Sequence, residues 1–441
     1  MRTAWMRGLA TAALATGIAA PARSQPAAPA APASGHAQHE PAATSLFEGR
    51  DASGTAWLPP ETPMYGLHRR AGSWELMAHG VGFLQFLSES GRRGTDQFGS
   101  INWIMGMARR PLGGGRFGLR AMLSLEPWTI RGCGYPDLLA TGEVCRGEVI
   151  RDRQHPHDLF MELAAEYRHP VGDSLHWEAY GGLAGEPALG PAAYPHRLSA
   201  MGNPLAPIGH HWLDATHITF GVLTAGVAAD RWKAEASIFN GREPDERRSN
   251  LDPAALDSFS ARVWYLPTRA IAIQVSAGRL TEAEAPDHPG GPRVDVRRIT
   301  ASITWHRPVF TRAVWASTVA WGRNTEEGVA TDALLLESTL LRDDREAWFG
   351  RFETVVKSAH DLEAPGDGTF TVAKLQGGHV RYFTPWRGLQ PGVGGSVSLG
   401  IVPEALRALY GRRLNPGLAV YVTLRPRRHG EHGGHAEHGG H

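Results

Sequence analysis

The sequence has few cysteines, no long apolar run and almost no net charge. Its 441 residues include 2 cysteines, and 45 Lys and Arg residues against 44 Asp and Glu residues leave a formal net charge of +1. This balance gives no argument for a nucleic-acid or acidic partner, and we expect no nucleic-acid binding. No segment after the N-terminal region reaches the roughly 18 apolar residues that a membrane-spanning helix needs. If the mature chain enters a membrane, it must therefore do so as a β-barrel.

Amphipathic helical periodicity is also scarce between Trp74 and Pro426. The chain instead contains 53 Gly and 14 Trp, and Gly with Trp is common in barrels that have tight turns and interfacial aromatic girdles. Residues 1–24 have the form of a secretory signal, in which Arg2 and Arg7 precede an apolar core and a small-residue cleavage pattern. We therefore expect the mature protein to leave the cytoplasm.

The cysteine pair is expected to be a disulfide. In an exported chain, two cysteines more often bond to each other than serve as a nucleophile or a metal site. A bond between Cys133 and Cys145 would close a short loop and stabilise it by about 3 kcal/mol through loss of chain entropy in the unfolded state.

Composition divides the chain into four regions. Residues 1–24 are the expected signal, and residues 25–72 are an Ala/Pro/His-containing periplasmic tether and lead-in, whose first part lacks the apolar content to build a core. Residues 73–426 are the expected barrel, and residues 427–441 form a His/Gly-rich tail with no apolar residue large enough to pack. We expect the lead-in to pack at the periplasmic mouth.

A two-residue period recurs through the barrel region. In the run from Leu159, the residues Met161, Leu163 and Ala165 share one face and Glu162 and Glu166 the other. Such alternation is typical of a strand between an apolar and a polar environment. A soluble β-sandwich would also alternate, but it does not explain why Leu, Trp and Ile occupy one face of almost every strand while charged residues occupy the other. The sequence therefore predicts an all-β fold, a transmembrane antiparallel barrel.

The connections between strands indicate its size and orientation. Short connections alternate with longer ones, as in outer-membrane barrels that have short periplasmic turns and long extracellular loops. The expected long connections are Ser88–Gln97, Thr129–Asp158, Glu186–Ala215, Gly241–Asp257, Thr281–Val296, Arg323–Thr331, Ser358–Thr369 and Pro403–Arg412. Counting segments gives about 16 strands, so the outer membrane of a Gram-negative bacterium is the expected location. Two of the loops are long enough to fold inward as plugs.

Histidines gather in two of the long loops. The first group contains His155, His157 and Asp158, and the second contains the set His210, His211, Asp214 and His217. The strands that these loops enter are separated by one strand, so the groups lie roughly 10 Å apart at the extracellular rim. Imidazole with carboxylate suits Cu(II) or Zn(II), which makes a metal site one interpretation. Hydrogen bonds that hold the loops in place are the other.

The tail is the third histidine group. It contains a histidine at every third residue, at positions His429, His432, His435, His438 and His441. Short His-rich tracts commonly bind metal ions, so the tail is expected to bind Cu or Zn ions in the periplasm.

Charged residues are expected to line the lumen. The carboxylates form an acidic sector, and cations lie opposite. The acidic set is Glu126, Glu162, Glu166 and Glu178, and the basic set is Arg298, Arg351 and Lys357. Mixed charges of this kind line pores more often than they catalyse. A lipid hydrolase built from His196, Ser199 and Asn203 is a minor alternative, weakened because all three residues lie in one expected loop. We expect no enzymatic activity.

Four segments carry a resemblance to a known family. The runs Arg109–Gly115, Asp152–Leu163, Asn203–His217 and Asn240–Glu246 resemble a poorly characterised family of bacterial outer-membrane barrels that occurs with heavy-metal, particularly copper, resistance systems. The resemblance extends from Trp74 to about Ser358. A looser similarity to copper resistance B outer-membrane proteins lies in the His-bearing leader, but residues 25–45 contain no Met, which weighs against a copper(I)-specific role.

Three functions follow as expectations. The first is a barrel that binds or passes transition-metal ions and contributes to metal resistance or homeostasis. Its expected partners are outer-membrane lipid, metal ions and periplasmic metal-resistance proteins. The alternative is a general or small-solute porin in which the rim histidines are structural, and the minor alternative is the hydrolase.

Overall fold

The computed structural model of the protein describes residue 48 and residues 50–253, 255–284 and 293–429. These residues all belong to one compact unit, Ser45–His441. The expected signal, the tether up to residue 47 and the tail from residue 430 lie outside the described residues. No helix in the described ranges is both long and apolar enough to cross a bilayer.

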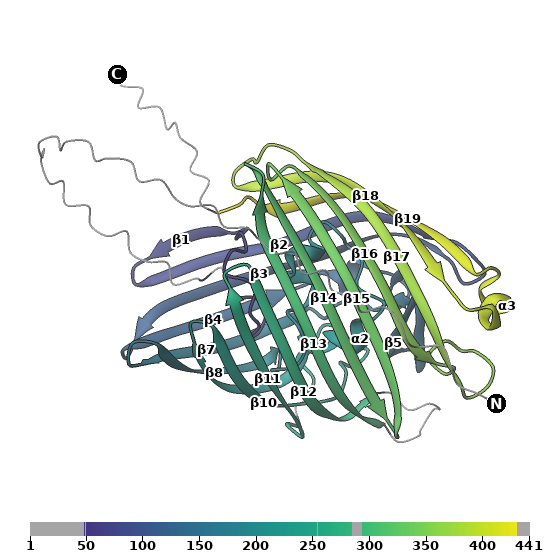
Figure 1. The fold of residues 1–441 in the computed structure, drawn as a ribbon, viewed down its shortest axis with the longest axis horizontal. Helices are drawn as coiled ribbons and strands as arrows, with labels where there is room; N and C mark the ends of the chain where they lie inside the picture. Colours follow the sequence, from purple (N-terminus) through teal and green to yellow (C-terminus); the bar gives the residue numbers. More distant parts are fainter. Residues whose placement is uncertain (1–47, 49, 254, 285–292, 430–441) are drawn as a thin grey trace, which may run out of the picture. The chain divides into compact units, whose positions relative to one another are not determined.

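The chain folds into a closed antiparallel barrel (Figure 1). One sheet contains 17 strands, of which the short β1 (Leu67–Ala71) pairs with β2 alone, so the other 16 form the wall. The ring closes where β19 pairs with β2, for example through Val420 opposite Phe86. The wall strands are β2 (Trp74–Glu89), β3 (Asp96–Leu112), β4 (Gly115–Leu123), β7 (Phe160–Val171), β8 (Leu175–Gly185), β9 (Thr219–Ala229), β10 (Trp232–Phe239), β11 (Ser258–Thr268), β12 (Ile271–Glu284), β13 (Val294–Val309), β14 (Ala313–Glu326), β15 (Val329–Arg342), β16 (Glu346–Ser358), β17 (Thr369–Tyr382), β18 (Leu389–Ile401) and β19 (Leu414–Pro426).

Each wall strand has an apolar outer face and a mostly polar inner face. In β19, Val420, Val422 and Leu424 are exposed, whereas Tyr421 and Thr423 between them are buried. A barrel with this exterior belongs in lipid, because closure leaves no unpaired sheet edge and the outer side chains match the hydrocarbon. The predicted fold class and the outer-membrane location are confirmed.

The two rims differ in the length of their connections. The turn from β3 to β4 uses Gly113 and Gly114 at φ values of 56° and 80°, the left-handed pair that a type I′ hairpin turn requires. Such short turns share a rim with the start of β2 and the end of β19, which makes that rim periplasmic. The expected long connection Arg323–Thr331 is wrong, because β14 and β15 stay paired up to Glu326 opposite Val329.

The long loops carry the remaining short elements. The connection from β4 to β7 contains a separate two-stranded sheet, and the connection from β8 to β9 contains several short helical turns. The bounds are α1 (Glu126–Thr129), β5 (Tyr135–Cys145), β6 (Glu148–Gln154), η1 (Tyr194–His196), η2 (Leu198–Ala200), α2 (His210–Leu213), η3 (Ala215–His217), η4 (Glu404–Leu406) and α3 (Arg407–Tyr410). Cys133 and Cys145 are joined by a disulfide across the first of these loops, with their Cα atoms 5.8 Å apart.

Substitutions on the outer face test the burial of β19 in lipid. Val420, near the middle of the strand, is 47% exposed, and Leu414, at its extracellular end, is 53% exposed. We expect Val420→Arg to lower the free energy of unfolding by about 2–4 kcal/mol and Leu414→Arg by about 0–1 kcal/mol, because the cost of an arginine depends on its depth in the bilayer. Equilibrium unfolding in lipid vesicles measures both. Equal costs would place the bilayer elsewhere on the wall.

Candidate metal centre

The chain between residues 50 and 65 contacts side chains of the barrel wall that point into the lumen. The Asp51 carboxylate accepts a hydrogen bond from Arg109 at 2.5 Å, and Arg120 donates to the Gly54 carbonyl at 2.7 Å. Trp57 is buried in a cluster that includes Trp264 of β11. These contacts hold the segment inside the half of the barrel nearer the periplasmic rim. Tyr65, in the expected lead-in, donates to Asp344 of the β15–β16 turn at 2.5 Å.

The loop between β8 and β9 also folds into the lumen. Arg197 donates to Glu337 of β15 at 2.6 Å and to Asp214 of its own loop at 2.6 Å. Farther around the wall, Asn203 donates to Gln376 of β17 at 2.8 Å. The loop therefore spans the lumen rather than standing above the rim.

The loop between β4 and β7 occupies the extracellular half. Lys374 of β17 donates to Asp137 at 2.6 Å and to Glu89 at 2.7 Å, and Lys357 of β16 donates to Thr141 at 2.6 Å. Together the three inward segments narrow the lumen. The length of the two loops made this arrangement possible, but the sequence alone did not determine it.

Five histidines from these two loops meet inside the barrel. All five are buried: His155, His157, His210, His211 and His217. Their ring centroids form a continuous series, with separations of 5.3 Å for His157 to His217, 5.2 Å for His217 to His210, and 5.9 Å for His210 to His155. His211 extends the series at 5.6 Å from His155. The loops thus bring together both groups that the sequence placed at the rim, but at a buried position.

Three rings of this cluster are oriented alike. The Nδ1 atoms of His157 and His210 lie 2.8 Å from the carboxylates of Glu126 and Asp214 respectively. The Nδ1 atom of His217 lies 2.8 Å from the Asp214 carbonyl. An oxygen at Nδ1 fixes the tautomer that carries the lone pair on Nε2, which is how most metal-binding histidines are held.

The Nε2 atoms of these rings have few other partners. Those of His210 and His217 are buried without a hydrogen bond, and that of His157 lies 3.0 Å from the Tyr194 hydroxyl. The Tyr194 ring also lies 5.5 Å from the His210 ring. A buried imidazole nitrogen without a partner is costly, and a cation at this position would satisfy it.

Burial keeps most of the cluster neutral. It lowers the pKa values of His210, His217 and His155 below the ordinary histidine value, and that of His211 to about 4. His157 differs: burial acts against protonation, but the adjacent Glu126 carboxylate outweighs it and raises the pKa. At neutral pH the four rings other than His157 are therefore neutral and able to donate lone pairs.

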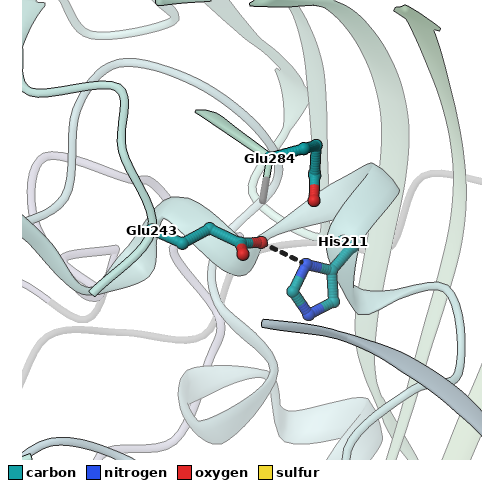
Figure 2. A group of neighbouring side chains, drawn as sticks. All are labelled: His211, Glu243 and Glu284. Atoms are coloured by element: carbon teal, nitrogen blue, oxygen red, sulfur yellow. Dashed lines mark ion pairs between the residues drawn. The ribbon is translucent and has the colours of Figure 1, made fainter. Parts of the chain in front are cut away.

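A second group of ligand atoms lies beside His211. The Nδ1 atom of His211 is 2.8 Å from Glu243, and ligand atoms of His211, Glu243 and Glu284 all lie within 4.8 Å of one another. The three side chains point toward one another from α2, the β10–β11 loop and the end of β12 (Figure 2). One imidazole with two carboxylates is a donor set for divalent ions such as Zn(II).

Two predicted ligands have other partners in the structure. Asp158 lies 3.2 Å from Arg248, and burial raises its pKa to about 7 despite this cation. The Asp214 carboxylate contacts both Arg197 and His210. Burial raises the pKa of Asp214, but these two partners lower it by more, so that the pKa lies below the ordinary value. Asp214 therefore positions a histidine rather than facing the shared space itself.

The lumen charges are arranged differently from the expected opposed sectors. The seven residues expected in the lumen are buried: Glu126, Glu162, Glu166, Glu178, Arg298, Arg351 and Lys357. The carboxylates, however, do not form an acidic sector, because cations stand among them: Arg120 is 3.1 Å from Glu162, Arg109 is 2.7 Å from Glu166, and Lys233 is 3.2 Å from Glu178. Periodicity placed these residues on the inner face but could not show which neighbours would pair.

The remaining candidates are distributed as follows. His429 is described, and its ring lies 3.8 Å from that of His68; the tail histidines after it lie outside the described residues. The hydrolase candidates bond to separate partners, since Ser199 donates to Glu337 at 2.8 Å and Asn203 to Gln376. The His196 ring lies beside Trp103 at 4.8 Å.

Several residues near the cluster were not identified from the sequence. Tyr194, Glu143, Glu243 and Glu284 come from four different segments, and none stands in a recognisable ligand spacing. Only Glu243 carried a signal, since it lies in one of the segments that resemble the metal-associated family. The others share a site only because the loops fold inward.

Comparisons with known proteins describe the fold. No family model matches the chain, and no curated protein matches it. Among solved structures it is similar to OmpF of Salmonella typhi, in a complex with daunomycin, at 11% identity and a TM-score of 0.49 over 81% of this chain and 100% of that one. An anion-selective porin from Comamonas acidovorans is similar at 9% identity and a TM-score of 0.47 over 80% and 99% of the two chains. OprB of Pseudomonas putida is similar at 9% identity and a TM-score of 0.45 over 80% and 94%.

Removal of one buried cation tests whether the β8–β9 loop closes the lumen. Arg197→Ala leaves Asp214 and Glu337 buried without their shared partner, which typically costs about 3–5 kcal/mol. We expect the loop to detach and the single-channel conductance in planar bilayers to rise severalfold.

The matched control is Arg323→Ala. It removes an arginine from the exposed pair with Asp332 on β14 and β15, and the conductance should stay unchanged. If the folded Arg197→Ala barrel conducts like the unmodified one, the loop is held by its other contacts.

Proposed function

We propose that this protein is a porin-like outer-membrane barrel that handles transition-metal ions through the five-histidine cluster in its lumen. The observation that carries the proposal is the shared orientation of His157, His210 and His217, each with Nδ1 beside an oxygen acceptor. Neutral imidazole nitrogens suit Zn(II) and Cu(II). The residues present fit such an ion by donor type and by the oxygens behind them. His210 and His217, whose pKa values are lowered, also fit it by protonation state.

The position of the cluster supports a role in passage as well as binding. His211 lines a cavity of about 710 Å³ together with loop residues such as Arg151 and Asp361, on the side of the long loops. His157 and Tyr194 line a different cavity of about 170 Å³, which also contacts Asp51 and Tyr65 of the N-terminal segment. The imidazole series connects the two cavities, so successive sites would exist for an ion moving along the lumen.

A general or small-solute porin is the second candidate. It is favoured by the charges of both signs on the inner wall, among them Arg351 near Glu337 and Lys374 near Glu89. In that case the histidines hold the inward loops in place. The loops would then limit the size of the solute that passes, because they narrow the lumen.

The environment of the protein follows from the same proposal. A barrel that collects or releases metal ions at the periplasmic rim would work with periplasmic metal-resistance proteins, and the tail histidines would add ion-binding capacity there.

Calorimetric titration with Zn(II) and Cu(II) distinguishes the candidates. The proteins to compare are the detergent-refolded full chain, a chain truncated after Arg428, and His210→Ala/His217→Ala. We expect truncation to remove weaker sites and leave a tight one, and the double substitution to weaken the tight site by at least tenfold because two nitrogen ligands are lost.

His379→Ala provides a matched control. His379 is half-exposed and lies 2.6 Å from Glu346, far along the chain from both histidine loops, and its loss should leave the tight site unchanged. If all binding disappears with the tail, the lumen histidines are structural and the porin is the better account.

The pH dependence of binding tests the role of Glu126. A metal ion competes with protons for imidazole, and an ordinary histidine has a pKa near 6.5. Glu126 raises the pKa of His157. As the pH is lowered, the Zn(II) affinity of the unmodified protein should therefore start to fall while the pH is still above 6.5. The contributions of His210 and His217, whose pKa values are lowered, should fall only below it.

Glu126→Gln removes the charge and should abolish the first of these two steps. Titrations between pH 5 and pH 8 measure both proteins. An unchanged profile would show that His157 is not a ligand.

A further inference from the structure

The methionines of the described chain converge on one region of the lumen. Of 9 methionines in the sequence, Met1 and Met6 precede the described residues and Met201 lines the cavity of about 170 Å³. The other six pack in one cluster with Trp103, consisting of Met64, Met77, Met105, Met107, Met122 and Met161. Met64 lies in the segment before β1, and the other five lie on the neighbouring wall strands β2, β3, β4 and β7.

Strand register places several of these side chains directly opposite one another. Met77 of β2 pairs with Met107 of β3, and His79 pairs with Met105. Directly opposed residues have Cβ atoms about 4.5–5.5 Å apart. Accordingly, the His79 Nε2 atom lies only 3.1 Å from the Met105 sulfur.

A second imidazole completes the arrangement from the opposite side. His196, in the β8–β9 loop, has its ring 5.5 Å from that of His79, and its Nε2 atom is buried without a hydrogen bond. Burial also lowers the pKa of His196 well below the ordinary value, so the ring is neutral. His79, His196, Met77 and Met107 all line the cavity of about 170 Å³, which is large enough for an ion.

The charges near this cavity are compensated or already engaged. Arg120, whose charge acts on both rings, is paired with Glu162 at 3.1 Å and Glu166 at 3.5 Å. The Met201 sulfur accepts a hydrogen bond from Arg425 at 2.9 Å, so Met201 is not counted among the ligands.

We propose that His79, His196, Met77 and Met107 form a second metal site, selective for a soft monovalent cation of the Cu(I) or Ag(I) class. Thioether sulfur is the protein ligand that favours Cu(I) over the divalent ions preferred by imidazole and carboxylate. The site is separate from the five-histidine cluster, although His157 of that cluster lines the same cavity. It provides the thioethers that the leader lacks.

The three groups of ligands follow one another in a fixed order along the lumen. The carboxylate-containing group at His211 lies toward the long loops, the imidazole cluster follows, and the sulfur site lies beside the N-terminal segment, which contributes Met64 and Tyr65 to the cavity. Ligand softness therefore increases toward the periplasmic rim. An ion that reaches the last site in its monovalent state would be held there in preference to Zn(II).

Silver ions test the site, because Ag(I) has the ligand preference of Cu(I) and needs no reductant. The affinity of the detergent-refolded full chain for Ag(I) is measured by competition with a chelator in chloride-free buffer. We expect Met77→Leu/Met107→Leu to weaken Ag(I) binding by at least tenfold and to leave Zn(II) binding unchanged. Leucine preserves the volume of methionine, so the packing should be retained.

The matched control is Met122→Leu/Met161→Leu. These two residues belong to the same apolar cluster but do not line the cavity, and their replacement should change the Ag(I) affinity by less than twofold. Barrel formation is verified for each variant by heat-modifiable migration on gels. If the cavity double variant does not fold, His196→Gln, which changes a loop residue, should cause the same selective loss.

Unchanged Ag(I) affinity in the cavity variant, or an equal loss in both double variants, would overturn the site and show that the methionines only fill space. Because Zn(II) is titrated in parallel, failure of this site and failure of the five-histidine cluster give different results.

Discussion

Every charge buried in the lumen needs a partner, and the interior of this protein is organised by that requirement. An unpaired buried charge costs several kcal/mol, whereas a paired one is tolerated when its remaining hydrogen-bonding atoms are also satisfied. Arg262 illustrates the pattern, since it bonds to Glu235 of the wall and reaches Glu186 at the start of the β8–β9 loop. Removal of the β8–β9 loop from the lumen would take Glu186 away from Arg262 and leave this wall arginine with fewer partners. The inward loop and the wall therefore depend on each other for charge pairing.

The same requirement explains why the histidines stand out. The arginines and carboxylates around them are matched, for example Arg197 between Asp214 and Glu337. His210 and His217 are each held at Nδ1, and their Nε2 atoms are buried with no hydrogen-bond partner. Under the proposed function, these imidazoles, with Nδ1 held by an oxygen, present Nε2 to a metal ion.

The lumen is also divided chemically along its length. Carboxylates with His211, then imidazoles, then thioethers succeed one another between the long loops and the N-terminal segment. This division agrees with the proposed role in selecting among metal ions.

The sequence by itself determined the wall. Alternation of residues such as Glu162 and Leu163, together with short and long connections, predicted an antiparallel barrel of about the observed size, because the inner and outer faces of a strand in lipid are imposed residue by residue. It failed locally at Arg323–Thr331, where polar residues continue the strands instead of forming a loop. Only the tertiary structure decided how the lumen is occupied. The path of the loops and the pairing of Arg120 with Glu162 depend on contacts between segments distant in the chain. The same is true of the contacts of His157 with His217 and of His79 with His196. Those contacts carry no period and no fixed spacing, so the residue types of the site were visible in the sequence but their arrangement was not.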